Sequence, residues 1–429
     1  MARSALSSAV RTPFGCFVVG RSVSLAGSAI TPVALSLAVL QASHRPSDLG
    51  VVLAVQVAAQ LGLLLVGGVL GDRWPRRALL VGTNLGAGLT QGAVAAILLT
   101  GHYQLALVAC LQFINGALEA FASPALRGIV PELVESAQLP RANATLATAK
   151  NLTKVLGPVV AGLLVAARGG GIAIAVDAIS FLAAAAIFSR LRLADTPSGP
   201  SGDSVLTEIR RGWRTFRSTR WLWATTASFA VINLIGTGTW QILGPEITIA
   251  RANAPVWGMA LSVRAIGALF MGVVLYRHAP QRFLRSGQLL AALGACGLLG
   301  LGIDLSAPWF LLCAFVSGLG FAAPSIAWDT CVHQHIPRQQ LSRISAYNDL
   351  LSYTCVPVGQ LLVAPAAAWL GPANVALYAG IGFIAAALAP LSSRSVRALA
   401  LPSQPTARTR PAKAQKTPTC RIATRPRPK

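Results

Sequence analysis

The segment GGVLGDRWPRR, residues Gly67–Arg77, marks an abrupt change from apolar to charged sequence. It ends a run of 23 residues, Leu49–Gly71, without a charged side chain, and an aspartate, Asp72, then precedes three arginines within five positions. A helix of about 20 apolar residues spans the roughly 30 Å hydrocarbon core of a bilayer. The segment therefore predicts the end of a membrane-spanning helix, followed by a charged loop.

The composition of the whole chain favours a membrane protein. Of its 429 residues, 54% are hydrophobic and 11% are charged, whereas soluble proteins contain about 25% charged residues. The net charge of +23 comes from basic residues between and after the apolar runs. That placement is typical of cytoplasmic loops and not of a nucleic-acid-binding surface. The seven cysteines form no CxxC pair, so we expect no disulfide framework, metal or cofactor.

Apolar segments long enough to be membrane helices recur along the chain. We expect twelve such spans, with glycine and proline inside many of them, as membrane helices tolerate. They are Phe14–Leu40, Leu49–Gly71, Ala78–Leu99, Gln104–Leu126, Ala144–Ala167, Gly171–Ser189, Leu222–Pro245, Val256–Tyr276, Gly287–Ile303, Pro308–Thr330, Ile344–Leu370 and Ala373–Leu391.

The distribution of basic residues predicts the orientation. With a cytoplasmic N-terminus, 29 of the 36 Lys and Arg residues fall in cytoplasmic segments and three in outer loops, as the positive-inside rule requires. We expect a multi-pass protein of the cell inner (plasma) membrane with both termini cytoplasmic. Residues 1–189 and 221–397 would form two six-helix bundles, joined by a basic linker at 190–220. Residues 398–429 would form a disordered basic tail that contacts membrane lipids.

The charged loop at Asp72 has two interpretations. The carboxylate can accept hydrogen bonds from a helix N-terminus or pair with an arginine, and such a clamp would hold one conformation and release in another. Alternatively, the arginines are a topological anchor that keeps the loop inside. The residues alone leave both interpretations open.

The same loop resembles the signature of the major facilitator superfamily, approximately G-x-x-x-D-R-x-G-R-R. The matching residues are Gly68, Asp72, Arg73, Arg76 and Arg77, with Pro75 in place of the usual glycine. In the fifth span, KVLGPVVAG is similar to the G-P-x-x-G-G element of exporters in this superfamily. The resemblance implies gating or conformational roles for the loop residues and for Gly157, Pro158 and Gly162.

Two longer stretches, SPALRGIVPELVESAQLPRANA and IPRQQLSRISAYNDL, resemble the drug- and siderophore-exporting branch that includes the enterobactin exporter. The sequence differs from this branch at two places. Ser28 occupies a position in the first span where members of the branch often carry an aspartate. The counterpart of the opening loop in the C-terminal half, GVVLYRHAPQR, has no acid, so we expect an asymmetric gate.

The resemblance implies an all-α fold of twelve transmembrane helices in two pseudo-symmetric six-helix bundles. It implies a monomeric secondary active transporter, not an enzyme, that exports a small organic molecule by alternating access. An antibiotic, a siderophore or a metabolite would leave in exchange for protons. Two alternatives remain: a non-transporting membrane sensor with the basic tail as its output, and a polytopic lipid-modifying enzyme, although the sequence shows no catalytic cluster for the latter.

Charged residues inside the spans are the candidates for function, because each costs about 2.5–3.5 kcal/mol at mid-bilayer. Glu119, Arg21 and Lys150 have similar expected depths, roughly 10 Å from the cytoplasmic face at 1.5 Å per residue. Glu119 could therefore exchange cationic partners and couple transport to protons, or it could belong to a static ion network. Asp177 in the sixth span is the second coupling candidate, although a structural role is expected for it.

Polar residues along four spans complete the predicted site. In the fourth span Gln112, Asn115 and Glu119 recur at i, i+3 and i+7, which places them on one helical face. The family resemblance implies that the first, fourth, seventh and tenth spans line the substrate cavity. The residues predicted to face substrate are Arg21, Gln112, Asn115, Lys150, Asn233, Trp240 and Gln241.

Overall fold

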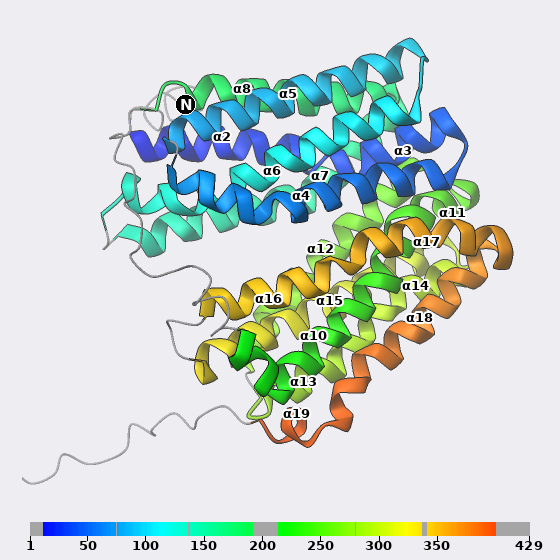
Figure 1. Ribbon diagram of the computed structural model, residues 1–429. Coiled ribbons are helices and arrows are strands. Elements are labelled where there is room, and N and C mark those ends of the chain that lie inside the picture. Colours follow the sequence, from blue (N-terminus) through cyan, green and yellow to red (C-terminus); the bar gives the residue numbers. More distant parts are fainter. Residues whose placement is uncertain are drawn as a thin grey trace, which may run out of the picture.

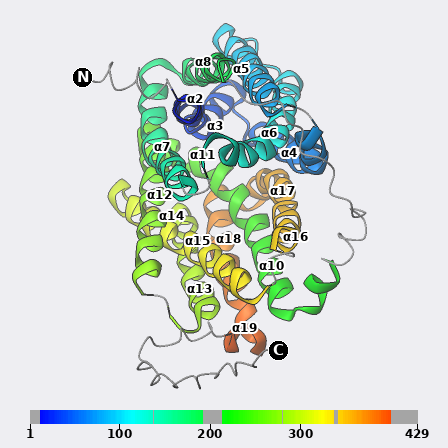
Figure 2. The same cartoon turned by 90° about the vertical axis from the view of Figure 1, so that its left-hand side faces the viewer.

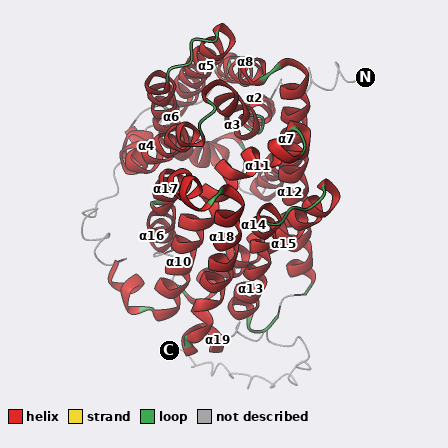
Figure 3. Ribbon diagram, turned by 90° about the vertical axis from the view of Figure 1, so that its right-hand side faces the viewer, coloured by secondary structure: helices red, strands yellow, loops and turns green. Residues whose placement is uncertain are grey.

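The computed structural model describes residues 12–73, 75–135, 138–191, 213–278, 280–336 and 341–399. These residues form helices joined by short loops, arranged as two bundles that lie side by side (Figure 1). Figure 2 shows the two bundles from a second direction, and Figure 3 shows that the described residues contain no strand.

The N-terminal bundle contains six spans, of which the first is divided into two helices. Its helices are α2 (Pro13–Ser28), α3 (Thr31–Ser43), α4 (Pro46–Arg73), α5 (Arg76–Thr100), α6 (Leu105–Leu133), α7 (Leu139–Arg168) and α8 (Gly170–Phe188).

The C-terminal bundle also contains six spans, and three of them are divided. Its elements are α10 (Arg220–Ile232), η2 (Asn233–Thr237), η3 (Thr239–Leu243), α11 (Gly244–Arg251), α12 (Ala254–Arg277), α13 (Phe283–Ala291), η4 (Ala292–Ala295), α14 (Cys296–Gly302), α15 (Ala307–His335), α16 (Leu341–Tyr353), α17 (Cys355–Leu370), α18 (Pro372–Leu388), η6 (Ala389–Ser392) and α19 (Arg394–Ala398).

Ten helical stretches in the described part of the chain are long and apolar enough to cross a membrane. The other two of the twelve spans are α5 and the seventh, Arg220–Arg251, which pass through the bundles with the rest. Both carry polar side chains that the bundles bury: Asn84 and Gln91 in α5, and Asn233 in the seventh span. Internal hydrogen bonds make such residues tolerable in a membrane span.

The first span differs from the continuous helix expected over Phe14–Leu40. It breaks after Ser28 and resumes at Thr31, with Pro32 in the first turn of the second helix. Proline has no backbone N–H and therefore favours a helix start over a helix interior. The Thr31 hydroxyl donates to Asp177 of α8 at 2.6 Å, which ties the break to the bundle interior.

The two bundles converge at one end and separate at the other. We name the end with residue 12, the loop residues 280–282 and residue 399 the terminus end, and the end with the loops at 44–45, 101–104, 252–253 and 371 the far end. α5 and α8 lie on the side of the N-terminal bundle away from its partner (Figure 2). α4, α6 and α7 lie on the side toward the partner (Figure 2).

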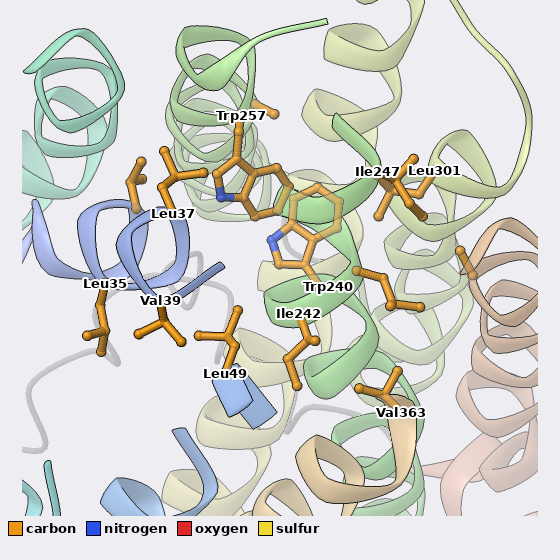
Figure 4. Close-up of a cluster of buried hydrophobic side chains, with 14 of the residues drawn as sticks. Leu35, Leu37, Val39, Leu49, Trp240, Ile242, Ile247, Trp257, Leu301 and Val363 are labelled. Carbon is orange, nitrogen blue, oxygen red and sulfur yellow. The ribbon is translucent and has the colours of Figure 1, made fainter. Parts of the chain in front are cut away.

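Among the described residues, apolar packing joins the bundles toward the far end. One continuous core there contains Leu37 and Leu49 of the N-terminal bundle together with Ile242 and Trp257 of the C-terminal bundle (Figure 4). Toward the terminus end the described residues form two separate cores, one for each bundle. Phe17, Leu80 and Phe188 belong to the N-terminal one and Phe283, Val332 and Ile344 to the C-terminal one. The far end is therefore closed by burial, whereas no shared core among the described residues closes the terminus end.

Candidate substrate and coupling sites

Arg21 and Glu119 lie close enough for electrostatic attraction between α2 and α6. Their charged atoms do not come within the 4.0 Å of a direct ion pair. Arg21 is half-buried, and the Glu119 side chain is exposed on the bundle. Since a charge that faces lipid is costly, this exposed face is best accommodated toward the space between the bundles. The structure thus brings together two of the three charged residues that the sequence placed at one depth.

Lys150 does not join this pair. The electrostatic attraction on Glu119 comes from Arg21, whereas Lys150 lies beside Lys154, one turn further along α7. Both lysine side chains are exposed, and like charges at i and i+4 repel. Matching depth made Lys150 a possible partner of Glu119, but the described residues show no contact between the two, because depth does not specify which side of α7 a residue occupies. Lys154, which the sequence reasoning did not select, is as accessible as Lys150.

Gln112 belongs to a buried hydrogen-bond chain instead of a cavity surface. It is fully buried and donates to Gln91 of α5 at 3.2 Å, and Asn115 donates to Gln112 at 3.4 Å. Gln91 in turn donates to Asp177 of α8 at 3.2 Å. The expectation that Gln112 faces substrate is therefore wrong, because both polar atoms of its amide are hydrogen-bonded inside the bundle. Asn115 is half-buried and is the end of the chain nearer to Glu119.

Asp177 is fully buried at the other end of this chain. One carboxylate oxygen, Oδ2, accepts hydrogen bonds from Thr31 and Gln91, while Oδ1 is buried without a partner among the described residues. The side chain therefore holds α3, α5 and α8 together. This geometry favours the structural role expected for Asp177. Neither Thr31 nor Gln91 was selected from the sequence, because single polar residues in apolar runs show no periodic pattern.

The polar residues of the seventh span divide between two environments. Trp240 and Gln241 line a cavity of about 100 Å³ inside the C-terminal bundle. Asn233 is buried and donates to the backbone carbonyl of Ser352 in α16 at 3.1 Å. It does not line that cavity. The structure thus supports a cavity position for two of the three predicted residues and gives Asn233 a helix-packing role.

The backbone of the seventh span is unusual beside this cavity. Two π-helical turns, η2 and η3, succeed one another across its middle. π-Helical turns widen a helix locally and occur frequently at functional sites. The carboxamide of Gln360 in α17 donates to Gln241 at 2.7 Å. The irregular turns therefore coincide with the cavity wall.

Part of the loop that opened the sequence lies outside the described side chains. The backbone of α4 is helical through Arg73, but the surroundings of Gly68 and the side chains of Asp72 and Arg73 lie outside what the structure describes. Arg76 forms a 2.7 Å ion pair with Glu132 of α6, and Arg77 donates to the carbonyl of Ser189 after α8. Both contacts lie within the N-terminal bundle.

The glycine-proline element of α7 forms a close contact between the bundles. A Cβ atom added to Gly258 of α12 would lie 2.3 Å from the carbonyl oxygen of Pro158, and one added to Gly162 would lie 3.2 Å from the backbone of Ala254. Gly157 instead meets Ala29, at the break in the first span, where a Cβ would lie 2.3 Å from the alanine side chain. The element therefore permits backbone approach at the far end.

Comparison with known proteins decides the family. The sequence model of the Major Facilitator Superfamily matches residues 17–355. The chain belongs to this superfamily. Its members transport small molecules across membranes, so the protein is a multi-pass membrane transporter and its fold is the twelve-helix, two-bundle fold expected from the sequence.

Two relatives are exporters. The chain is 27% identical to the multidrug efflux pump Tap of Mycolicibacterium fortuitum over 357 residues, covering 80% of this chain and 86% of the relative. It is 24% identical to the enterobactin exporter EntS of Shigella flexneri over 392 residues, covering 86% and 89%. These matches agree with the exporter branch that the sequence resembles.

Solved structures share the fold at low identity. The nucleoside transporter NupG, as its D323A mutant, superposes with a TM-score of 0.75 at 9% identity, covering 89% of this chain and 99% of that chain. A bacterial homologue of the lysosomal transporter Spinster, in an inward-facing and unoccupied conformation, superposes with a TM-score of 0.69 at 10% identity, covering 90% and 95%. These likenesses show the fold alone.

Proposed function

We propose that the protein exports a small organic molecule by alternating access in exchange for protons. The observation that carries the proposal is the one-ended contact between the bundles, with the Arg21–Glu119 pair on the surfaces next to the open end. Likeness to two exporters along most of the chain supports the outward direction of transport.

Alternating access requires two closures that exclude each other. The far-end closure in this structure consists of a shared apolar core and the glycine contacts between α7 and α12. Rocking the bundles about the middle would bury apolar surface at the terminus end and expose it at the far end. With the termini cytoplasmic, the described conformation opens inward and is ready to load substrate.

Glu119 would couple this movement to protons. In the inward-open form Arg21 lies close enough to attract its carboxylate, which would be ionised there. In the outward-open form it would take a proton from the outside, and it would release that proton to the cytoplasm after the bundles return. Antiport requires the solute and the proton to exclude each other, so substrate would load only after Glu119 has released its proton. Protons and the solute thus cross in opposite directions.

The expected setting follows from the same proposal. The protein would lie in the inner (plasma) membrane with both termini and the 190–220 linker in the cytoplasm, and it would work as a monomer because each chain contains both bundles. Membrane lipids would surround the bundles and contact the basic tail of residues 398–429. Most of the linker and nearly all of the tail lie outside the described residues.

Transport in everted membrane vesicles tests the proposal directly. Vesicles that contain the full-length protein should accumulate at least one of ethidium, fluorescein and enterobactin when the lumen is acidified, and a protonophore should abolish the accumulation. Vesicles from cells without the protein provide the control. Accumulation that persists at full rate with the protonophore would overturn proton antiport, and no accumulation of any probe would overturn the export function.

A further inference from the structure

Arg264 is a charged residue of the C-terminal bundle that neither the proposed coupling nor the gating uses. It lies near the middle of α12, a helix of 24 residues, and therefore near the middle of the membrane. Its side chain is partly accessible and lines the cavity beside Trp240 and Gln241. A guanidinium at this depth is costly unless something compensates the charge.

The surroundings of Arg264 are aromatic. Its guanidinium carbon lies 4.6 Å from the centre of the Trp240 ring and 4.7 Å from the centre of the Phe321 ring. Cation–π contacts attract the guanidinium to both rings. They leave its N–H donors unsatisfied, however, because ring faces replace neither a carboxylate nor a carbonyl.

No protein anion neutralises this guanidinium among the described residues. The two ion pairs found there belong to Arg76 and Arg251, and Arg264 makes no hydrogen bond in the same part of the chain. The indole N–H of Trp240 is a second buried donor without a partner there. Both unpartnered donors belong to residues that line one cavity, so the cavity is short of acceptors.

The N-terminal bundle likewise has more accessible cations than accessible acids within its spans. Arg21, Lys150 and Lys154 are accessible or half-buried within spans of the N-terminal bundle, whereas Glu119 is the accessible acid among them. Asp177 is fully buried in its own hydrogen-bond chain. The accessible charges inside the spans of the N-terminal bundle are therefore mostly positive, and a positive surface attracts anions and repels cations.

We propose that the transported molecule is an organic anion with a flat unsaturated group, and that Arg264 binds its anionic group between Trp240 and Phe321. This inference rests on the proposed export function and specifies its substrate class. A cation would face an unpaired guanidinium, and a neutral solute would leave the charge uncompensated. A carboxylate or phenolate supplies acceptors for the fork of N–H donors, while the flanking rings stack on its unsaturated part.

Three probes that share one ring system test the proposal on the purified full-length protein in nanodiscs. They are 2-naphthoate, 2-naphthamide and 2-naphthylmethylammonium, which differ in charge. Ligand-observed NMR should show 2-naphthoate binding at least tenfold more tightly than the amide, with the ammonium weakest. Equal affinities, or an order that favours the ammonium, would overturn the proposal without any variant.

Variants on the same helix assign the preference to Arg264. Arg264→Gln should abolish the tenfold preference, and Arg264→Lys should keep part of it because the positive charge remains without the planar fork. Arg277→Gln, an exposed arginine at the terminus end of α12, is the matched control and should bind like the wild type. A preference that survives in a folded Arg264→Gln protein would overturn the assignment.

The binding test is separable from the vesicle assay. Proton-driven export without any anion preference would contradict the proposed substrate class but not the proposed export function. If the protein prefers anions through Arg264 but transports none of the probes, the result would contradict the proposed export function but not the proposed binding site.

Discussion

At the scale of single residues, the charges inside the spans separate into three environments. Glu119 and Arg21 attract each other at an accessible surface, Asp177 is consumed by hydrogen bonds in the bundle interior, and Arg264 lies against two aromatic rings without an acid among the described residues. Only the first environment suits a carboxylate that must change its protonation and its partner during transport. Access to water, and not depth alone, distinguishes the coupling candidate from the structural acid.

Replacement of Glu119 by Gln should uncouple transport from protons. The amide keeps size and hydrogen bonding but cannot release a proton, so we expect accumulation driven by a pH gradient to fall at least tenfold in everted vesicles. Exchange of substrate at equal pH on both sides should fall less than threefold. Glu135→Gln, an exposed glutamate just beyond α6, is the control. Normal gradient-driven transport by the Glu119 variant would make this residue structural.

At the scale of helices, the α7–α12 contact determines how closely the bundles approach at the far end. The backbone carbonyl of Pro158 lies where the side chain of any residue other than glycine would sit at position 258. A second contact of this kind joins α4 to α17, where a Cβ at Gly50 would lie 2.5 Å from the carbonyl oxygen of Gln360. Backbone atoms cannot rotate aside as side chains do, so both contacts depend on glycine.

Gly258→Ala should open the far end. The added methyl group requires α7 and α12 to separate, and overpacking of this kind costs roughly 1–3 kcal/mol, or roughly 5- to 150-fold in a conformational equilibrium. Spin labels at Gln41 of α3 and Trp369 of α17, both exposed near the far end, should report a longer distance, and transport should slow severalfold.

Gly272→Ala is the matched control on the same helix. The nearest atom to an added Cβ there is Ile326 Cδ1, 4.0 Å away, so neither the distance nor the transport rate should change. Equal behaviour of the two variants would mean that the α7–α12 contact does not control the closure.

At the scale of the whole molecule, the described conformation has one core shared by the bundles and two separate cores, one in each bundle. A single rigid core along the full length would stabilise the protein more, but it would prevent the bundles from rocking. Restricting the shared apolar surface to one end keeps each bundle independently packed, because the two separate cores stay intact when the far end opens. The arrangement is what an alternating carrier requires.

The orientation of the molecule in the membrane is testable by reporter fusions. Fusions at residues 200 and 410 should report a cytoplasmic position, and a fusion at residue 251 should report an external one, because the basic residues concentrate on the side of the termini. An external signal at residue 200 would contradict both the orientation and the inward opening proposed for this conformation.

Sequence reasoning was sufficient for the architecture. Apolar runs of bilayer length predict twelve spans because lipid excludes unpaired backbone, and the loop around Asp72 together with Gly157, Pro158 and Gly162 pointed to the superfamily that the comparison showed. These features are local: each depends on composition, length or spacing within one segment, so no knowledge of packing is needed to find them.

Only the tertiary structure decided which polar residues face one another. Gln112 shares a predicted helical face with Glu119, yet it is buried against Gln91, and Lys150 lies beside Lys154 instead of Glu119. The partners of Asp177 come from two other helices, and the rings around Arg264 come from the seventh and tenth spans. Such contacts depend on the rotation of each helix about its axis, which many small packing terms set together and which no single segment encodes.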